Sequence, residues 1–126
     1  MLGFFRRLFE DRTRELAPGR GWTISVVGES NFQLALRRIY ARGDGHDRKV
    51  FATMVPEPTN KHDSNAILVS IEGKPVGYLP RELAQTYLVG KARCSAKVVG
   101  GFELNDGSTA HFGVKLNMAW PPRLKV

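Results

Sequence analysis

The chain has 126 residues and a formal net charge of +7, a size that suits one compact domain with a short extension. Its single cysteine, Cys94, excludes an internal disulfide and fits a reducing, cytoplasmic setting, and no apolar run reaches the roughly 20 residues that span a bilayer. The basic balance favours a polyanionic partner, either nucleic acid or an anionic membrane surface.

Residues 1–17 are predicted to form an amphipathic helix, because apolar side chains recur along one stripe at helical spacing. The Pro-Gly-rich residues 18–20 then form a linker. We therefore expect an N-terminal helix and linker over residues 1–20, a barrel domain over residues 21–120 that folds without them, and a tail over residues 121–126. The apolar stripe of residues 1–17 is expected to serve self-association, docking on a protein partner or contact with a membrane surface.

The rest of the chain alternates mostly between strand patterns and turns. A helix is predicted from Phe32 to Tyr40, opened by a capping box of Ser30 and Gln33, and a second from Arg81 to Val89, with Leu88 facing inward. Strands are predicted over residues 22–27, 50–55, 66–71, 75–79, 93–99 and 110–118. About six short strands with two or three short helices indicate a mainly β fold, and a small OB-like β-barrel is the natural way to protect its sheet edges.

The motifs of common enzyme classes are absent from the sequence. There is no phosphate-cradling P-loop, no His-Glu-x-x-His pair and no nucleophile elbow. One cysteine and three scattered histidines (His46, His62 and His111) argue against a structural zinc site, and no histidine has an evident nucleophile beside it. We therefore predict a non-catalytic protein that uses no cofactor and no metal.

Three segments together resemble the HIRAN family: Val26–Phe32, Val55–Ile67 and Val76–Ala84. They include an Asn-x-x-Asp-x-Asn-Ala-Ile loop and a Val-Gly-Tyr-Leu-Pro-Arg-Glu-Leu-Ala turn, and the resemblance extends over residues 22–118. It implies an OB-like barrel that binds nucleic acid. In DNA-remodelling ATPases such domains capture the 3′-hydroxyl end of single-stranded DNA, and this chain looks like the stand-alone members of bacteria and phages.

The resemblance also implies individual DNA-contacting residues. Asp63 matches the acid that accepts the terminal 3′-hydroxyl, and His62 stands where a phenol ring neighbours that acid. Asn31 and Phe32 match a pair of tyrosines that hold the terminal nucleotides. The change to Asn31, and Ser30 where the DNA-capturing members carry arginine, imply weaker binding of the strand end.

Three further residues complete the implied site. Tyr78 and Arg81 match a histidine and a lysine that contact the DNA backbone, and Phe112 matches a base-stacking phenylalanine. Plainer roles compete with these: Asp63 can simply close a turn by bonding the backbone two residues on. Phe112 shares one face of its predicted strand with Val114 and Leu116, which favours packing in the core, and Tyr78 and Phe32 suit half-buried barrel positions.

Single-strand binders need flat rings for stacking and cations along the phosphate backbone, and the predicted site offers both. We therefore predict a non-catalytic nucleic-acid-binding module whose partner is single-stranded DNA or a DNA 3′ end, acting in repair, replication or phage DNA handling. The alternative is a protein-interaction adaptor that uses the N-terminal amphipathic helix and binds no specific DNA. A hydrolase subunit of unrecognised type is the third possibility.

Overall fold

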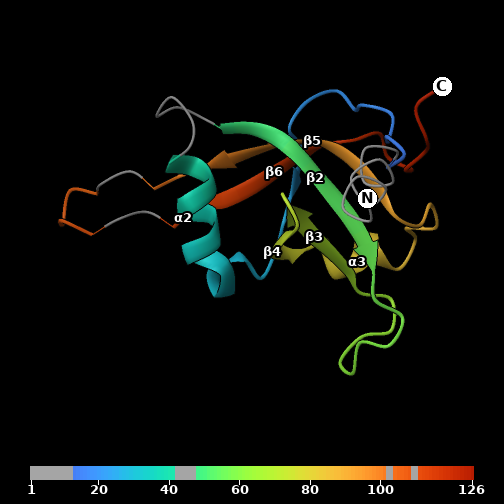
Figure 1. The fold of residues 1–126 in the computed structure, drawn as a ribbon, viewed down its shortest axis with the longest axis horizontal. Helices are drawn as coiled ribbons and strands as arrows, with labels where there is room; N and C mark the ends of the chain where they lie inside the picture. Colours follow the sequence, from blue (N-terminus) through green and yellow to red (C-terminus); the bar gives the residue numbers. More distant parts are fainter. Residues whose placement is uncertain (1–12, 42–47, 102–103, 109–110) are drawn as a thin grey trace, which may run out of the picture.

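The computed structural model describes residues 13–41, 48–101, 104–108 and 111–126 (Figure 1). Most of the predicted N-terminal helix, residues 1–12, lies outside the described residues. Within them, no helix has the length and hydropathy needed to cross a membrane, and no group of three or more His, Cys, Asp or Glu side chains is arranged to hold a metal ion.

The fold is mainly β, as predicted. The strands are β1 (Ile24–Ser25), β2 (Arg48–Pro56), β3 (Ile67–Ile71), β4 (Lys74–Tyr78), β5 (Ala92–Val99) and β6 (Gly113–Asn117). The helices are a 3₁₀ turn η1 (Glu29–Phe32), α2 (Gln33–Ala41) and α3 (Arg81–Ala84). All neighbouring strands are antiparallel, in the order β1-β6-β5-β2-β3-β4, and the sheet curls into a half-barrel with α2 packed against it (Figure 1).

The two edges of the sheet meet where Val27, just after β1, pairs with Tyr78 at the end of β4. The Val27 amide donates to the Tyr78 carbonyl at 2.9 Å, and the Tyr78 amide donates back to the Val27 carbonyl at 2.8 Å. Gly77 makes this approach possible, because a Cβ on it would lie 2.6 Å from the Val27 carbonyl oxygen. The two edges of the curled sheet are therefore joined by a pair of backbone bonds beside Gly77, where no side chain fits.

Alternation along the strands fills the interior with apolar side chains. In β5 the buried residues are Ala92, Cys94, Ala96 and Val98, and α2 adds Leu36 and Ile39, which are fully buried. Burial raises the pKa of the Cys94 thiol to about 12, so this thiol is neutral and inert at physiological pH.

The helix predicted over residues 1–17 is wrong for residues 13–17, which are not helical. The Leu16 amide donates to the Arg93 carbonyl and the Ala17 amide to the Arg123 carbonyl, both at 2.8 Å. Leu16 and Ala17 are buried, and Leu16 also pairs with Leu124 in the predicted tail. Long-range burial of two adjacent apolar residues outweighs local helical preference here. The domain division at residue 20 stays a prediction, although this packing argues for a boundary nearer the N-terminus.

Three local predictions need correction. No side chain caps η1: Gly28 precedes it in a left-handed conformation, and the Gln33 side chain bonds the Glu29 carbonyl and the backbone of Phe112. The second helix ends at Ala84 instead of Val89, since the buried Tyr87 turns inward and donates its hydroxyl to the Gly90 carbonyl at 2.8 Å. Leu88, expected to face inward, is 89% exposed as a result.

Candidate nucleic-acid interface

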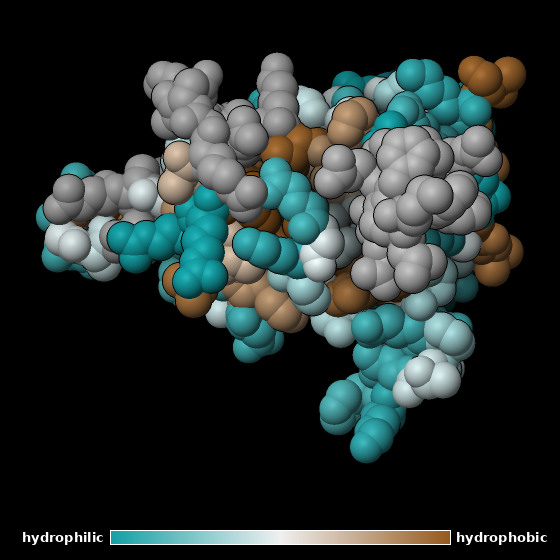
Figure 2. All heavy atoms as spheres, in the orientation of Figure 1, coloured by the Kyte–Doolittle hydropathy of each residue, from teal (hydrophilic) through white to brown (hydrophobic). Residues whose placement is uncertain are grey.

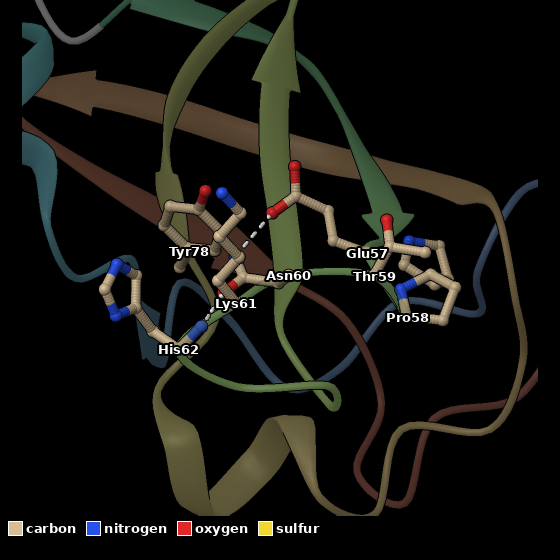
Figure 3. A pocket seen from close by; sticks show the side chains of 8 residues that line it. Glu57, Pro58, Thr59, Asn60, Lys61, His62 and Tyr78 are labelled. Carbon is tan, nitrogen blue, oxygen red and sulfur yellow. Dashed lines mark hydrogen bonds between the residues drawn. The ribbon is translucent and has the colours of Figure 1, made fainter.

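The loop between β2 and β3, residues 57–66, projects from the barrel as a mostly hydrophilic lobe (Figure 2). Asn60 organises it: its Oδ1 accepts from the His62 amide at 2.9 Å and from the Asp63 amide at 3.1 Å, while its Nδ2 donates to Glu57 Oε1 at 3.0 Å (Figure 3). An asparagine side chain that bonds the backbone a few residues on is a common way to build a turn. The loop conformation is therefore encoded locally.

Asp63 divides its two carboxylate oxygens between different tasks. Oδ1 accepts from the Asn65 amide at 2.9 Å, which is the turn-closing bond expected from the sequence. Oδ2 lies 3.9 Å from Nε of Arg81, at the start of α3. The Arg81 side chain is 76% exposed, so solvent screens this ion pair and it contributes little to stability.

Two adjacent hollows flank this loop. The first has a volume of about 450 Å³ (Figure 3) and is lined by Pro56, Glu57, Pro58, Thr59, Asn60, Lys61, His62 and Tyr78. The second has a volume of about 300 Å³ and is lined by Val27, Asn60, His62, Asp63, Ala66, Tyr78, Leu79, Arg81 and Ala84. They share Asn60, His62 and Tyr78, so a ligand longer than one hollow can occupy both.

Tyr78 stands where β4, the closing bridge and the loop meet. Burial and, after it, a hydrogen bond to the Glu57 carboxylate and its charge raise the pKa of the Tyr78 phenol. The phenol is therefore neutral at physiological pH, and it adds a ring to both hollows without adding negative charge. This suits the approach of a polyanion.

The structure brings together four of the seven residues that the sequence singled out: His62, Asp63, Tyr78 and Arg81 all line the second hollow. Asn31 and Phe32 line neither hollow but belong to η1, which contacts β4. The Asn31 side-chain amide donates to the Gly28 carbonyl at 3.4 Å.

Phe112, the seventh residue, lines neither hollow. Its ring packs against the core 5.2 Å from the ring of Tyr40, and the Gln33 amide bonds both its backbone amide and its carbonyl at 2.8 Å. This is the packing role that strand alternation favoured.

Asn60 and Glu57 were not among the sequence-predicted site residues, yet both line the first hollow. The signal for Asn60 was present in the Asn-x-x-Asp spacing, because that spacing lets its side chain reach the amides of the turn. Glu57 offered no such signal, since its contact with Tyr78 joins residues that lie 21 positions apart in the sequence.

The fold and the site define a small antiparallel β-barrel that presents two rings, two cations and two carboxylates around two loop-built hollows, which is the make-up of a binding module. The model of the HIRAN domain family matches residues 27–99, more than half of the chain. The chain therefore belongs to the HIRAN domain family, whose members are nucleic-acid-binding modules. Comparisons with curated proteins and with solved structures gave no match.

Proposed function

We propose that the protein binds single-stranded DNA without catalysis and holds its free 3′-hydroxyl end at Asp63. The proposal rests on the observation that the two oxygens of the Asp63 carboxylate make different contacts. Because Oδ1 keeps the turn closed through the Asn65 amide, Oδ2 is left at the second hollow beside Arg81. An ionised carboxylate offers acceptors only, and a 3′-hydroxyl is a donor.

The surroundings of Asp63 suit the last nucleotides of a strand. Tyr78 and His62 offer flat rings on which bases can stack, and stacking of this kind tolerates any sequence. Arg81 and Lys61 are exposed cations that can meet the phosphates. Asn31 and Phe32 in η1 border the same edge of the barrel and would contact the penultimate nucleotide. Phe112, packed on Tyr40, is left out of this interface.

A strand that ends in a 3′-phosphate tests the proposal directly. The phosphate brings like charge against Asp63 in a partly desolvated hollow, which is unfavourable, whereas a 3′-hydroxyl donates a hydrogen bond. A hydrogen bond to a charged group contributes about 1.5–3 kcal/mol, so the hydroxyl end should bind at least about tenfold more tightly. Competition anisotropy at one salt concentration measures this ratio.

The Asp63→Asn variant should reduce the ratio of the affinities for the 3′-hydroxyl and the 3′-phosphate ends. The control is Asp106→Asn, because Asp106 closes a similar turn in the loop between β5 and β6 and lines neither hollow. Equal affinity of the wild-type protein for both ends would contradict the proposal that Asp63 binds the 3′-hydroxyl end. Within cells, such a module would act on strand ends during repair, replication or phage DNA handling.

A further inference from the structure

The outward face of the sheet carries a second group of cations and rings. We define it as the outer basic face: Trp22, Ser25, Phe51, Arg93, Lys97 and Lys115. Phe51 is 49% exposed, although it lies in the middle of β2. None of these residues lines the two hollows around Asp63.

Two lysines face each other across this sheet. In the strand register Lys97 of β5 lies opposite Lys115 of β6, and Nζ of Lys115 donates to the Ser25 hydroxyl at 2.7 Å. Like charges directly opposite on neighbouring strands repel each other. A bound polyanion would reduce this repulsion, so the pair favours an anionic ligand.

Two of the cations also lie over aromatic rings. Nζ of Lys97 is 5.1 Å from the centre of the Trp22 ring, and the Arg93 guanidinium is 4.4 Å from the centre of the Phe51 ring. Arg93 is also ion-paired with the Glu15 carboxylate at 2.9 Å, so Lys97 and Lys115 are the cations offered to a phosphate. A ring with a cation at its face offers a surface for a base and a charge for the phosphate next to it. This combination fits single-stranded nucleic acid better than an acidic protein surface, which has no bases to stack.

The strand register shows that the outer basic face and the hollows lie on one continuous side of the sheet. Tyr78 pairs with Leu68 and Leu68 with Val55, and all three are half-buried positions on the outward side. Phe51 lies four residues before Val55 in β2, so it projects to the same side of the sheet. The backbone position of β2 that lies opposite Lys97 is six residues before Val55, a rise of about 20 Å along the strand.

We propose that the outer basic face binds the phosphodiester backbone and bases of the single strand on the 5′ side of its captured end. The strand would leave Tyr78, cross Leu68 and Val55, contact Phe51, and reach Lys97 and Lys115. The direction of this path rests on the function proposed above; the binding surface itself does not.

The first test compares the wild-type protein with a Lys97→Gln/Lys115→Gln variant on two strands with free 3′-hydroxyls, one of about four nucleotides and one of about twelve. Wild type should bind the longer strand more tightly, and the variant should lose this gain. The salt slope on the longer strand should become shallower by about 1.4, since each lysine-phosphate contact contributes about 0.7. An Arg37→Gln/Lys74→Gln variant removes the same charge from α2 and from the start of β4, and should keep the gain.

The second test follows Trp22 itself. The chain has two tryptophans, so a Trp120→Phe variant reports on Trp22 alone. The longer strand should quench its fluorescence and the shorter strand, held at Asp63, should not. Phe51→Leu should weaken binding of the longer strand by about fivefold or more, with circular dichroism showing that it is folded.

The outcomes separate the two proposals. If both strands bind equally and Trp22 is not quenched, the outer basic face is wrong, while a preference for 3′-hydroxyl ends would leave the reading of the strand end standing. If the lysine substitutions abolish the dependence of affinity on strand length and the wild-type protein shows no preference for a 3′-hydroxyl end, the outer basic face is supported and the role proposed for Asp63 is wrong. If neither strand binds at low salt, both proposals fail.

Discussion

Two loops of the barrel contain the same turn, and only one of them makes a hollow. Asp63 accepts from the amide of Asn65, and Asp106 accepts from the amide of Ser108, each at 2.9 Å and two residues on. Residues 104–108 are exposed throughout, and none of them lines the hollows described above. Around Asp63, by contrast, Tyr78, α3 and the closing bridge at Val27 enclose the turn.

The difference shows that an aspartate turn is not a site in itself. At Asp106 the local bonds also occupy one oxygen, since the amide and the hydroxyl of Ser108 both donate to Oδ1, and the residue lies in an exposed loop with no hollow around it. At Asp63 the local bond occupies one oxygen, and the packed barrel places the other beside a ring and a cation. Function in the first loop therefore depends on residues far from it in sequence.

The largest expected effect comes from the glycine that lets the barrel close behind Asp63. In Gly77→Ala the new Cβ would clash with Val26 and with the Val27 carbonyl, so we expect a loss of about 3 kcal/mol in the free energy of unfolding. Gly107→Ala is the matched control: Gly107 has φ +85° and no atom within 4 Å of a new Cβ, so backbone strain alone should cost about 1 kcal/mol. Urea unfolding measures both. Equal losses would contradict the role given to the closing bridge.

A smaller effect is expected from Asn60→Ala. The substitution removes the acceptor for the amides of His62 and Asp63 and the donor to Glu57, and should lower stability by about 2 kcal/mol. The preference for a 3′-hydroxyl end should fall with it, because Asp63 would no longer be held in place. Asp106→Ala should leave end binding unchanged. Normal hydrogen exchange at residues 62 and 63 in the Asn60→Ala protein would contradict this account of the loop.

The smallest effect concerns the titration of the exposed turn. Hydrogen bonds from Ser108, the side-chain hydroxyl first and then the amide, lower the pKa of Asp106 below its ordinary value of 3.8. A lowered pKa in the folded state adds stability above that ordinary value, and this stability is lost as the pH falls through the folded pKa. Ser108→Ala should move the pKa back toward 3.8, as followed by carboxyl NMR. A titration unchanged in Ser108→Ala would show that the hydroxyl is not the cause.

Much of the fold and part of the candidate site could be predicted from the sequence. Strand alternation predicted the sheet, the spacing of apolar residues predicted α2, and the family motifs located His62, Asp63, Tyr78 and Arg81, because these patterns are local. Two features were not predictable in this way. Residues 13–17 are not helical because their backbone bonds Arg93 and Leu16 pairs with Leu124. The Phe112 backbone is hydrogen-bonded by the side chain of Gln33, 79 residues away.

Packing across the sheet determines which residues pair in this way, and no periodic pattern along the sequence predicts these pairs. The same limit explains Asp63: its turn bond is a short-range property, whereas its neighbours Tyr78 and Arg81 arrive with β4 and α3. The sequence could therefore identify the residue and leave its two competing roles unresolved, and the structure accommodates both.

The backbone bond from the Lys125 amide to the Glu15 carbonyl, 2.8 Å long, has a consequence for protein engineering. The segments that lead into and out of the barrel run side by side at one corner, where Leu16 and Leu124 also pair. Domains with this geometry tolerate insertion into a host protein's loop and circular permutation. The exposed residues 104–108 would then be the place to open a permuted chain, because cutting there removes no buried side chain and leaves the Asp63 hollow intact.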